Sequence, residues 1–236
     1  MEDLKNRQLC CIVVPVYGEL SADDRRCLCQ YKRVFQGRDI LCIVPNSISA
    51  NIAKNLIEGY DFKIVGFDDG FFRNPVTYSR LLTMAGFYEY FKGYEYMLIA
   101  QLDAWVFSDR LDFWCGKGYD YVGAPWCHMC NHVCRPDADT SQRLVGNGGL
   151  SLRRIGVFAD KLAKLGGKLP DFIPEDIKLV QYLELNIPRC DEALLFSVEN
   201  RAADHVLKNG VKSMGFHNVK KLFPVEFDKI FKSLET

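Results

Sequence analysis

The fold is decided by one stretch, Tyr96-Met-Leu-Ile-Ala-Gln-Leu-Asp-Ala-Trp-Val-Phe107. Met97 to Ala100 form a short apolar run, which is typical of a strand buried in a parallel sheet. Asp103 follows closely, and a carboxylate in that place is costly unless a metal, a ligand or hydrogen bonds stabilise it. Because ligands of open α/β sheets bind outside the carboxyl ends of the strands, Asp103 is the first candidate site residue. The alternative is a turn or helix-capping aspartate, since a short helix is expected soon after it.

The segments before this stretch alternate between strand and helix patterns. Apolar runs predict strands at residues 10–16, 40–44 and 62–67, and helical patterns predict helices at 21–35 and 74–91. Ser21 with Asp24 forms a capping pair at the first helix, and Pro75 is favoured at the first position of the second. Such alternation is typical of βαβ units, so we expect an α/β fold with a mixed, mainly parallel central sheet flanked by helices.

After residue 124 the pattern becomes less regular. The expected elements are a polar loop at 125–143, a glycine cluster at 146–149, a strand near 150–152, a helix at 155–165 and a helix that begins at Pro174. No internal repeat, low-complexity segment or linker separates the two parts of the chain. Residues 1–236 are therefore expected to form a single domain.

Charge and composition exclude several classes of protein. The 236 residues contain 30 Lys+Arg and 30 Asp+Glu, so no overall basic field favours nucleic acid, although Arg153-Arg154 and Lys220-Lys221 could form local patches. No apolar stretch reaches the roughly 20 residues that span a bilayer, and the N-terminus does not resemble a signal peptide. The ten cysteines are therefore expected to be reduced thiols in a cytoplasmic protein.

Three other motifs contain residues that carry chemistry, and each has a plainer alternative. Gly146-Asn-Gly-Gly149 would let a backbone pass close to a ligand, or would form an ordinary tight turn. Glu175 and Asp176 could supply a general base at a pocket rim, or could be present because acidic residues suit a helix N-terminus. His217 in isolation is more often structural than a ligand, and a metal role requires that it pair with Asp103.

The loop segment Cys127-His-Met-Cys-Asn-His-Val-Cys134 contains ligand types that suit zinc. Its candidate ligands Cys127, Cys130 and Cys134 lie within eight residues, without the second, distant pair that structural zinc sites usually have. We therefore expect reduced thiols here rather than a zinc site.

Longer motifs resemble a known family. They are Leu98-Ile-Ala-Gln-Leu-Asp-Ala-Trp-Val-Phe-Ser-Asp-Arg-Leu111, Gly118-Tyr-Asp-Tyr-Val-Gly-Ala-Pro-Trp126 and Gly146-Asn-Gly-Gly-Leu-Ser-Leu-Arg153. Phe196-Ser-Val-Glu199 and Gly215-Phe-His217 are similar to the closing motif of the same family. With these motifs the chain resembles the glycosyltransferases of the GT-A (Rossmann-like) fold, and most closely the bacterial DUF5672 family, over residues 11–217.

The resemblance implies roles for individual residues. Asp103 matches the last aspartate of the Asp-x-Asp motif that binds the metal in GT-A enzymes, while Gln101 replaces the first aspartate and supplies no charge. His217 matches the C-terminal metal ligand, and Glu175-Asp176 matches the acidic motif whose aspartate is the base in inverting members. The other matches are donor-binding positions, namely Pro15, Val16 and Tyr17 at the nucleotide base, Arg80 near the diphosphate, and Asn147, Gly148 and Gly149 beside the donor sugar.

The resemblance thus implies a metal-dependent glycosyltransferase of the hexosyltransferase type, with Mn²⁺ or Mg²⁺ as cofactor. It would move a sugar from a nucleotide-sugar donor, a UDP-sugar being favoured, to a glycan or lipid-linked acceptor, and Asp176 implies inversion. Residues 1–124 would form the nucleotide-binding half and residues 125–236 the acceptor and metal half. The expected setting is bacterial surface polysaccharide synthesis, in the cytoplasm or peripheral to the inner face of the membrane. The alternative is a non-catalytic nucleotide-sugar-binding or scaffolding protein, which Gln101 favours.

Overall fold

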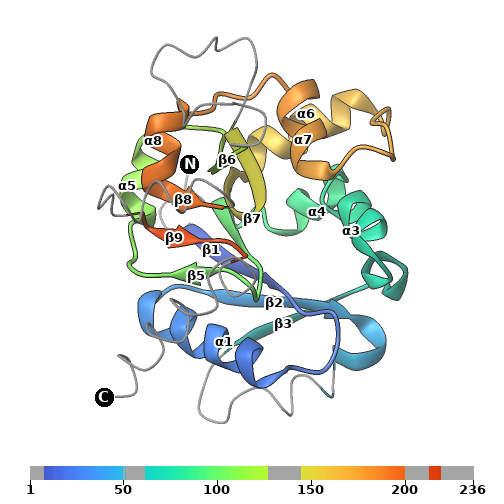
Figure 1. Cartoon of the computed structure of the whole chain (residues 1–236). Coiled ribbons are helices and arrows are strands. Elements are labelled where there is room, and N and C mark those ends of the chain that lie inside the picture. The colour runs from blue at the N-terminus through green and yellow to red at the C-terminus, as the bar shows by residue number, and fades with distance from the viewer. Residues whose placement is uncertain (1–7, 50, 52–61, 127–144, 200–212, 219–236) are drawn as a thin grey trace, which may run out of the picture.

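A six-stranded sheet forms the centre of the molecule (Figure 1). The computed structural model describes residues 8–49, 51, 62–126, 145–199 and 213–218. The strands of the large sheet are β1 (Gln8–Pro15), β2 (Ile40–Pro45), β3 (Lys63–Phe67), β4 (Tyr94–Ala100), β6 (Tyr121–Pro125) and β7 (Val145–Arg154). Their order is β3-β2-β1-β4-β7-β6, in which β1 to β4 run parallel and β7 runs antiparallel to both neighbours. The expected α/β class with a mixed, mainly parallel sheet is confirmed.

A second, smaller sheet lies beside the first and contains three strands in the order β5-β9-β8. These are β5 (Trp105–Val106), β8 (Ser197–Val198) and β9 (Gly215–Phe216). β5 follows β4 almost directly and pairs antiparallel with β9. The small sheet therefore brings a segment from late in the chain to the carboxyl end of β4.

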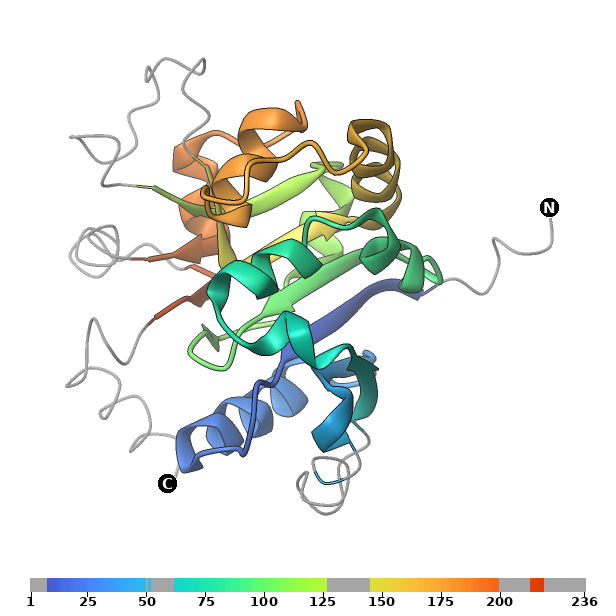
Figure 2. The same cartoon turned by 90° about the vertical axis from the view of Figure 1, so that its right-hand side faces the viewer.

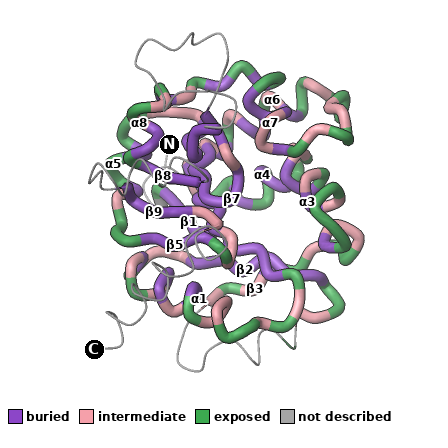
Figure 3. The backbone as a smooth tube through the Cα atoms, in the orientation of Figure 1, coloured by how far each residue is buried: buried purple, intermediate pink, exposed green. Residues whose placement is uncertain are grey.

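Helices cover both faces of the large sheet (Figures 1 and 2). One face carries α1 (Ala22–Val34), α5 (Leu111–Gly116) and α8 (Cys190–Phe196), and the other carries α3 (Pro75–Leu81), α4 (Ala85–Tyr90), α6 (Ile155–Leu165) and α7 (Glu175–Tyr182). Two short 3₁₀ helices are η1 (Asn46–Ile48) and η2 (Asp69–Phe72). Side chains alternate between the two cores along β1, and β2 is buried over its whole length (Figure 3). Buried central strands explain the continuous apolar runs in the sequence.

The local start signals of two helices are confirmed. Ser21 accepts from the backbone of Asp24, whose carboxylate accepts from Ser21 in turn, so α1 begins with a capping box. Asn74 caps α3 through the backbone N–H of Thr77, and Pro75 is its first residue. Helix caps depend only on residues that are neighbours in the chain, which explains why the sequence predicts them.

Two local expectations are wrong. The helix expected at 74–91 is two helices, because Met84 has extended backbone angles and separates α3 from α4. The Tyr88 hydroxyl donates to the carbonyl of Leu82 at this break, at 2.9 Å. The strand expected near 150–152 begins earlier, at Val145, so the glycine cluster lies inside β7 instead of before it, opposite an irregular stretch of β6. Glycine at such a place lets two backbones approach closely.

Seven cysteines lie in the described residues, and all of them are free thiols, five of them buried. The Cys127–Cys134 segment and Lys220-Lys221 lie outside the described residues. Within the described part of the chain, no helix combines the length and the apolar character that a bilayer crossing requires.

Candidate active site

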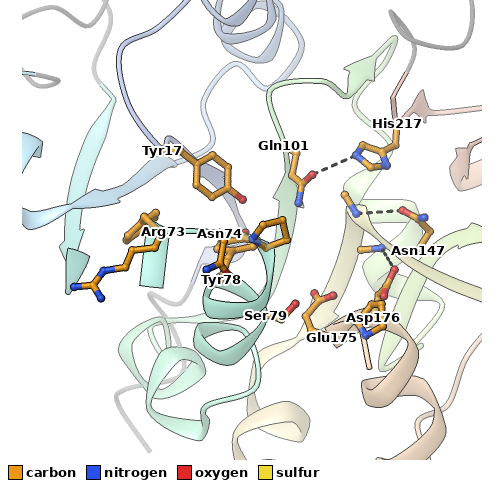
Figure 4. A pocket seen from close by; sticks show the side chains of 15 residues that line it. Tyr17, Arg73, Asn74, Tyr78, Ser79, Gln101, Asn147, Glu175, Asp176 and His217 are labelled. Atoms are coloured by element: carbon orange, nitrogen blue, oxygen red, sulfur yellow. Dashed lines mark hydrogen bonds between the residues drawn. The ribbon is translucent and has the colours of Figure 1, made fainter. Parts of the chain in front are cut away.

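The candidate site lies at the edge of the large sheet where β1 and β4 end. Because β7 is antiparallel to β4, its first residues lie at the same edge, and the backbone N–H of Gln101 donates to the carbonyl of Gly149 at 2.9 Å. Two cavities lie here, one of about 500 Å³ and one of about 280 Å³, and Tyr17 and Gln101 line both. The topology therefore brings residues from the start, middle and end of the chain together around these adjoining cavities, the larger of which is shown in Figure 4.

Asp103 and His217 meet beside these cavities. The Nε2 atom of His217 lies 3.1 Å from Oδ1 of Asp103 and 3.3 Å from Oε1 of Gln101. Asp103 is half exposed, whereas the side chain of His217 is only 12% exposed. The pairing that a metal role for His217 requires is therefore present in the structure.

The other ring nitrogen of His217 faces a second carboxylate. Nδ1 lies 3.3 Å from Oε1 of Glu199, whose side chain is nearly buried. Burial lowers the pKa of His217, but the contacts with Asp103 and Glu199 outweigh it and raise this pKa to about 9. The surroundings of the imidazole therefore favour positive charge, which is the proton in the free protein and would be a bound cation in its place at Nε2.

The residues around His217 fit a divalent cation that is shared with a ligand. Among the described residues, no three His, Cys, Asp or Glu side chains lie close enough to enclose a metal by themselves. The donors on the open side are the carboxylate of Asp103, the amide oxygen of Gln101 and Nε2 of His217. Carboxylate and amide oxygens suit Mn²⁺ or Mg²⁺. Glu199 occupies the place of the carboxylate that usually orients a metal-binding histidine from behind. Further oxygen ligands would have to come from the bound ligand.

Strand β7 passes between the imidazole and α7 as bare backbone. A Cβ atom at Gly148 would lie 3.1 Å from both carboxylate oxygens of Glu175, and one at Gly149 would overlap the ring of His217. Successive residues of a strand point to opposite faces. Gly148 therefore faces Glu175 and Gly149 faces the ring of His217, and only the thickness of β7 separates these two side chains. Close approach, rather than a turn, explains this motif.

Asp176 is the carboxylate of α7 that is best placed to accept a proton. Its Oδ1 accepts from the backbone of Ile177 at 2.8 Å and its Oδ2 from that of Gly148 at 3.3 Å. Burial raises the pKa of Asp176, and the adjacent charge of Glu175 raises it further, to about 7. A general base works best when its pKa lies near the working pH.

Glu175 is engaged differently, in a buried ion pair. Its Oε1 lies 2.6 Å from Nη2 of Arg153, whose side chain is fully buried. Arg153 also donates to Ser151 and to Tyr88, and its guanidinium lies 5.2 Å from the ring centroid of Tyr121. Glu175 therefore connects the start of α7 to β7, and its carboxylate is engaged by Arg153.

The expectation of a basic patch at Arg153-Arg154 is wrong for the same reason. Arg153 is buried in the core, and Arg154 pairs with Glu95 at 3.1 Å. Two adjacent residues of a strand point to opposite faces, so an Arg-Arg pair does not make a patch there.

The remaining candidate donor residues are divided between the two cavities. Pro15, Val16, Tyr17, Gln101 and Asp103 line the smaller cavity. The larger one is lined on one side by Asn147, Gly148, Gly149, Glu175, Asp176 and His217. Arg80 lines neither cavity and forms an exposed ion pair with Asp171 at 2.9 Å. A different arginine, Arg73, lines the larger cavity.

Two residues of the site have no role in the sequence interpretation. Glu199 is the last residue of the motif Phe196-Ser-Val-Glu199, and Arg153 is the last residue of the glycine motif that begins at Gly146. Their position at the end of a motif is the only signal, because their partners His217 and Glu175 are distant in sequence.

The motifs of the site correspond to a known family. The sequence profile of a family described as "Protein of unknown function (DUF5672)" matches residues 61–217. The chain belongs to the DUF5672 family. The match begins just before β3 and ends at His217, so it includes Asp103, the glycines of β7 and Asp176. No curated protein matches this DUF5672 chain.

Solved structures show which fold the DUF5672 chain has. The galactosyltransferase LgtC, in complex with donor and acceptor sugar analogues, is 12% identical over 87% of this chain and 86% of that one, with a TM-score of 0.52. The bifunctional glycosyltransferase WbbM is 13% identical over 89% of this chain and 45% of that one, with a TM-score of 0.56. The glycosyltransferase GlyE of Streptococcus pneumoniae TIGR4 is 12% identical over 90% and 55%, with a TM-score of 0.51. The DUF5672 chain therefore has the GT-A fold of these proteins.

Proposed function

We propose that this protein is a metal-dependent glycosyltransferase that moves a sugar from a nucleotide-sugar donor to an acceptor hydroxyl. One observation carries the proposal: the carboxylate of Asp103 and the imidazole of His217 lie 3.1 Å apart beside two cavities that share Tyr17 and Gln101. The fold is shared with glycosyltransferases, and this pair gives the fold a place where a diphosphate could bind. Neither observation alone identifies the reaction.

The cavities suggest how a donor would lie. The smaller cavity, between the end of β1 and Asp103, would hold the nucleoside, and the larger cavity would hold the sugar and the acceptor. The diphosphate would then lie between them, next to Asp103, Gln101 and His217. A divalent cation held there would stabilise the charge that develops on the nucleoside diphosphate leaving group.

Asp176 would act as the general base. An acceptor hydroxyl in the larger cavity would lose its proton to this carboxylate while its oxygen attacks the anomeric carbon, and the bond from that carbon to the diphosphate would break. Attack from the face opposite the diphosphate inverts the anomeric configuration. The ion pair between Glu175 and Arg153 would fix the start of α7 and thereby position the adjacent Asp176. Glu175 would not itself take the proton.

Finer features of the proposal come from the family resemblance. They are a UDP-sugar as donor, Mn²⁺ or Mg²⁺ as cation, a glycan or lipid-linked acceptor, and a role in bacterial surface polysaccharide synthesis at the cytoplasmic side of the membrane. A screen of nucleotide sugars, with released diphosphate as the signal, would test the donor.

The test of the proposal is the binding of UDP with Mn²⁺ to the wild type and to Asp103→Ala. Because the protein supplies few ligands of its own, we expect weak binding of Mn²⁺ alone and tighter binding with UDP. Asp103→Ala should lower the affinity for UDP in the presence of Mn²⁺ by at least about tenfold, as measured by titration calorimetry. Asp112→Ala is the control, because this aspartate is 75% exposed and lines neither cavity. Equal affinities in the two variants would contradict the proposed metal site.

Gln101 favours one other function, that of a non-catalytic nucleotide-sugar-binding or scaffolding protein. An amide at this position adds no charge to the cation site, so the site is less strongly charged than an Asp-x-Asp site. Binding of UDP-sugars without any donor hydrolysis or transfer, across a broad set of acceptors, would support this second function.

The pKa of Asp176 gives the enzyme hypothesis a pH dependence. Below about 7 this carboxyl is protonated and cannot accept a proton, so the transfer rate at saturating donor should fall about tenfold per pH unit as the pH decreases, and should level off above 7. Donor affinity measured at each pH separates this effect from weaker binding. A flat profile between about pH 5.5 and 8 would exclude Asp176 as the base.

A further inference from the structure

Tyr78 contains a buried polar atom that the fold leaves unpaired. The side chain lies on α3 and is 5% exposed, and its hydroxyl has no hydrogen-bond partner among the described residues. Three other buried tyrosines, Tyr31, Tyr88 and Tyr121, each donate to a backbone carbonyl. Buried tyrosine hydroxyls usually have a partner, so the unpaired one at Tyr78 requires an explanation.

The nearest candidate partner within the protein is Tyr17. The two rings are in edge contact, with centroids 5.3 Å apart. Burial raises the pKa of Tyr17, and the nearby Tyr78 hydroxyl partly opposes this rise, yet the two hydroxyls lack the geometry of a hydrogen bond. Tyr17 therefore does not satisfy Tyr78.

The position of Tyr78 suggests a partner from outside the protein. Tyr78 lines the larger cavity, and in Figure 4 Tyr17 and Tyr78 lie on one side of it while Asn147, Glu175 and Asp176 lie on the other. The ring of Tyr17 is 47% exposed and lines this cavity, so an aromatic face and an unpaired hydroxyl occur together. A hydroxyl needs a polar partner, and the carboxylate of Asp176 across the cavity disfavours an anionic one.

We infer that the Tyr78 hydroxyl forms a hydrogen bond with a hydroxyl group of a sugar bound in the larger cavity, while the ring of Tyr17 contacts the same sugar. This inference rests on the proposed function and makes Tyr78 a residue that determines specificity. A site built to hydrogen-bond a substrate hydroxyl rejects the analogue that lacks it, because the buried group of the protein is then left unpaired. The sugar belongs to the donor or to the acceptor.

The test is Tyr78→Phe, which removes only the unpaired hydroxyl. Because that hydroxyl forms no hydrogen bond with a described residue, the melting temperature of the free protein should stay the same or rise. The affinity for UDP with Mn²⁺ should be unchanged. If the sugar is that of the donor, the affinity for UDP-glucose, UDP-galactose or UDP-N-acetylglucosamine should fall about fivefold; if it is that of the acceptor, the KM for the acceptor should rise by a similar factor.

Tyr119→Phe is the matched control, because the hydroxyl of Tyr119 donates to Glu192 at 2.6 Å and lines neither cavity. It should show the opposite pattern, with a lower melting temperature and unchanged affinities. Two results would overturn the inference, namely a melting temperature that falls in Tyr78→Phe as in Tyr119→Phe, or sugar affinities and acceptor KM that equal those of the wild type. Failure of the wild type to bind UDP or any UDP-sugar would overturn the proposed function as well, so the two failures can be told apart.

Discussion

Asp176→Asn is expected to lower the rate of sugar transfer by about 10²–10⁴-fold while leaving donor binding intact. An amide has the shape of the carboxylate, and its oxygen can still accept from Ile177 or Gly148, but it cannot accept a proton from an attacking hydroxyl. The exchange also removes the repulsion between Asp176 and Glu175, so the fold should be preserved. The measurement is the rate of transfer at saturating donor, with UDP affinity determined in parallel.

Asp171→Asn is the control for this experiment. Asp171 precedes the same helix, is 60% exposed and pairs with Arg80 at the surface, outside both cavities. Its substitution should leave the transfer rate within about twofold of the wild type, since surface ion pairs contribute little. If Asp176→Asn also stays within that range, the base is another group and the mechanism given above is wrong.

Gly149→Ala is expected to weaken the cation-dependent binding of UDP strongly. A Cβ at this position overlaps the imidazole of His217, which Asp103 and Glu199 hold on its two nitrogens, so the ring must move. Movement of the ring separates Nε2 from Asp103, and loss of ligand geometry should weaken binding of UDP with Mn²⁺ by about 100-fold. Titration with UDP in the presence and absence of Mn²⁺ measures the effect, and binding without the metal should change less.

The same substitution elsewhere in the chain provides the control. Gly156 lies in α6, and a Cβ there would meet no atom within 4 Å. Gly156→Ala should therefore leave UDP affinity unchanged and raise the melting temperature, because alanine is favoured over glycine by about 1 kcal/mol inside a helix. Retention of Mn²⁺-dependent UDP binding by Gly149→Ala would mean that His217 is not a ligand of the cation.

The sequence predicts this fold well wherever the signal is local. The strands of the parallel part follow from apolar runs, and α1 and α3 follow from Ser21 with Asp24 and from Asn74-Pro75, because capping and burial act between near neighbours. It does not predict that β7 lies between β4 and β6, because no local pattern specifies which strands pair. The break between α3 and α4 is likewise not predicted, because the apolar residues keep their helical spacing across Met84, where the backbone becomes extended.

The candidate site follows the same division. Asp103 is recognisable from its place after a buried strand, and the glycines are recognisable as a motif, although their purpose is not. Pairing with His217 could be inferred only through family resemblance, because the two residues are distant in the sequence and meet only through the pairing of β5 with β9. Glu199 and Arg153 were beyond prediction, since a buried charge can be recognised only when its partner is known.

The placement of β7 has a consequence for how the protein is made. During synthesis β4 and β6 leave the ribosome first, and the strand that must lie between them is translated later. Until it arrives, both strands have an unpaired edge, which nascent chains expose to aggregation. That late strand also carries Gly148 and Gly149, so a fragment that ends at residue 124 lacks part of the candidate site.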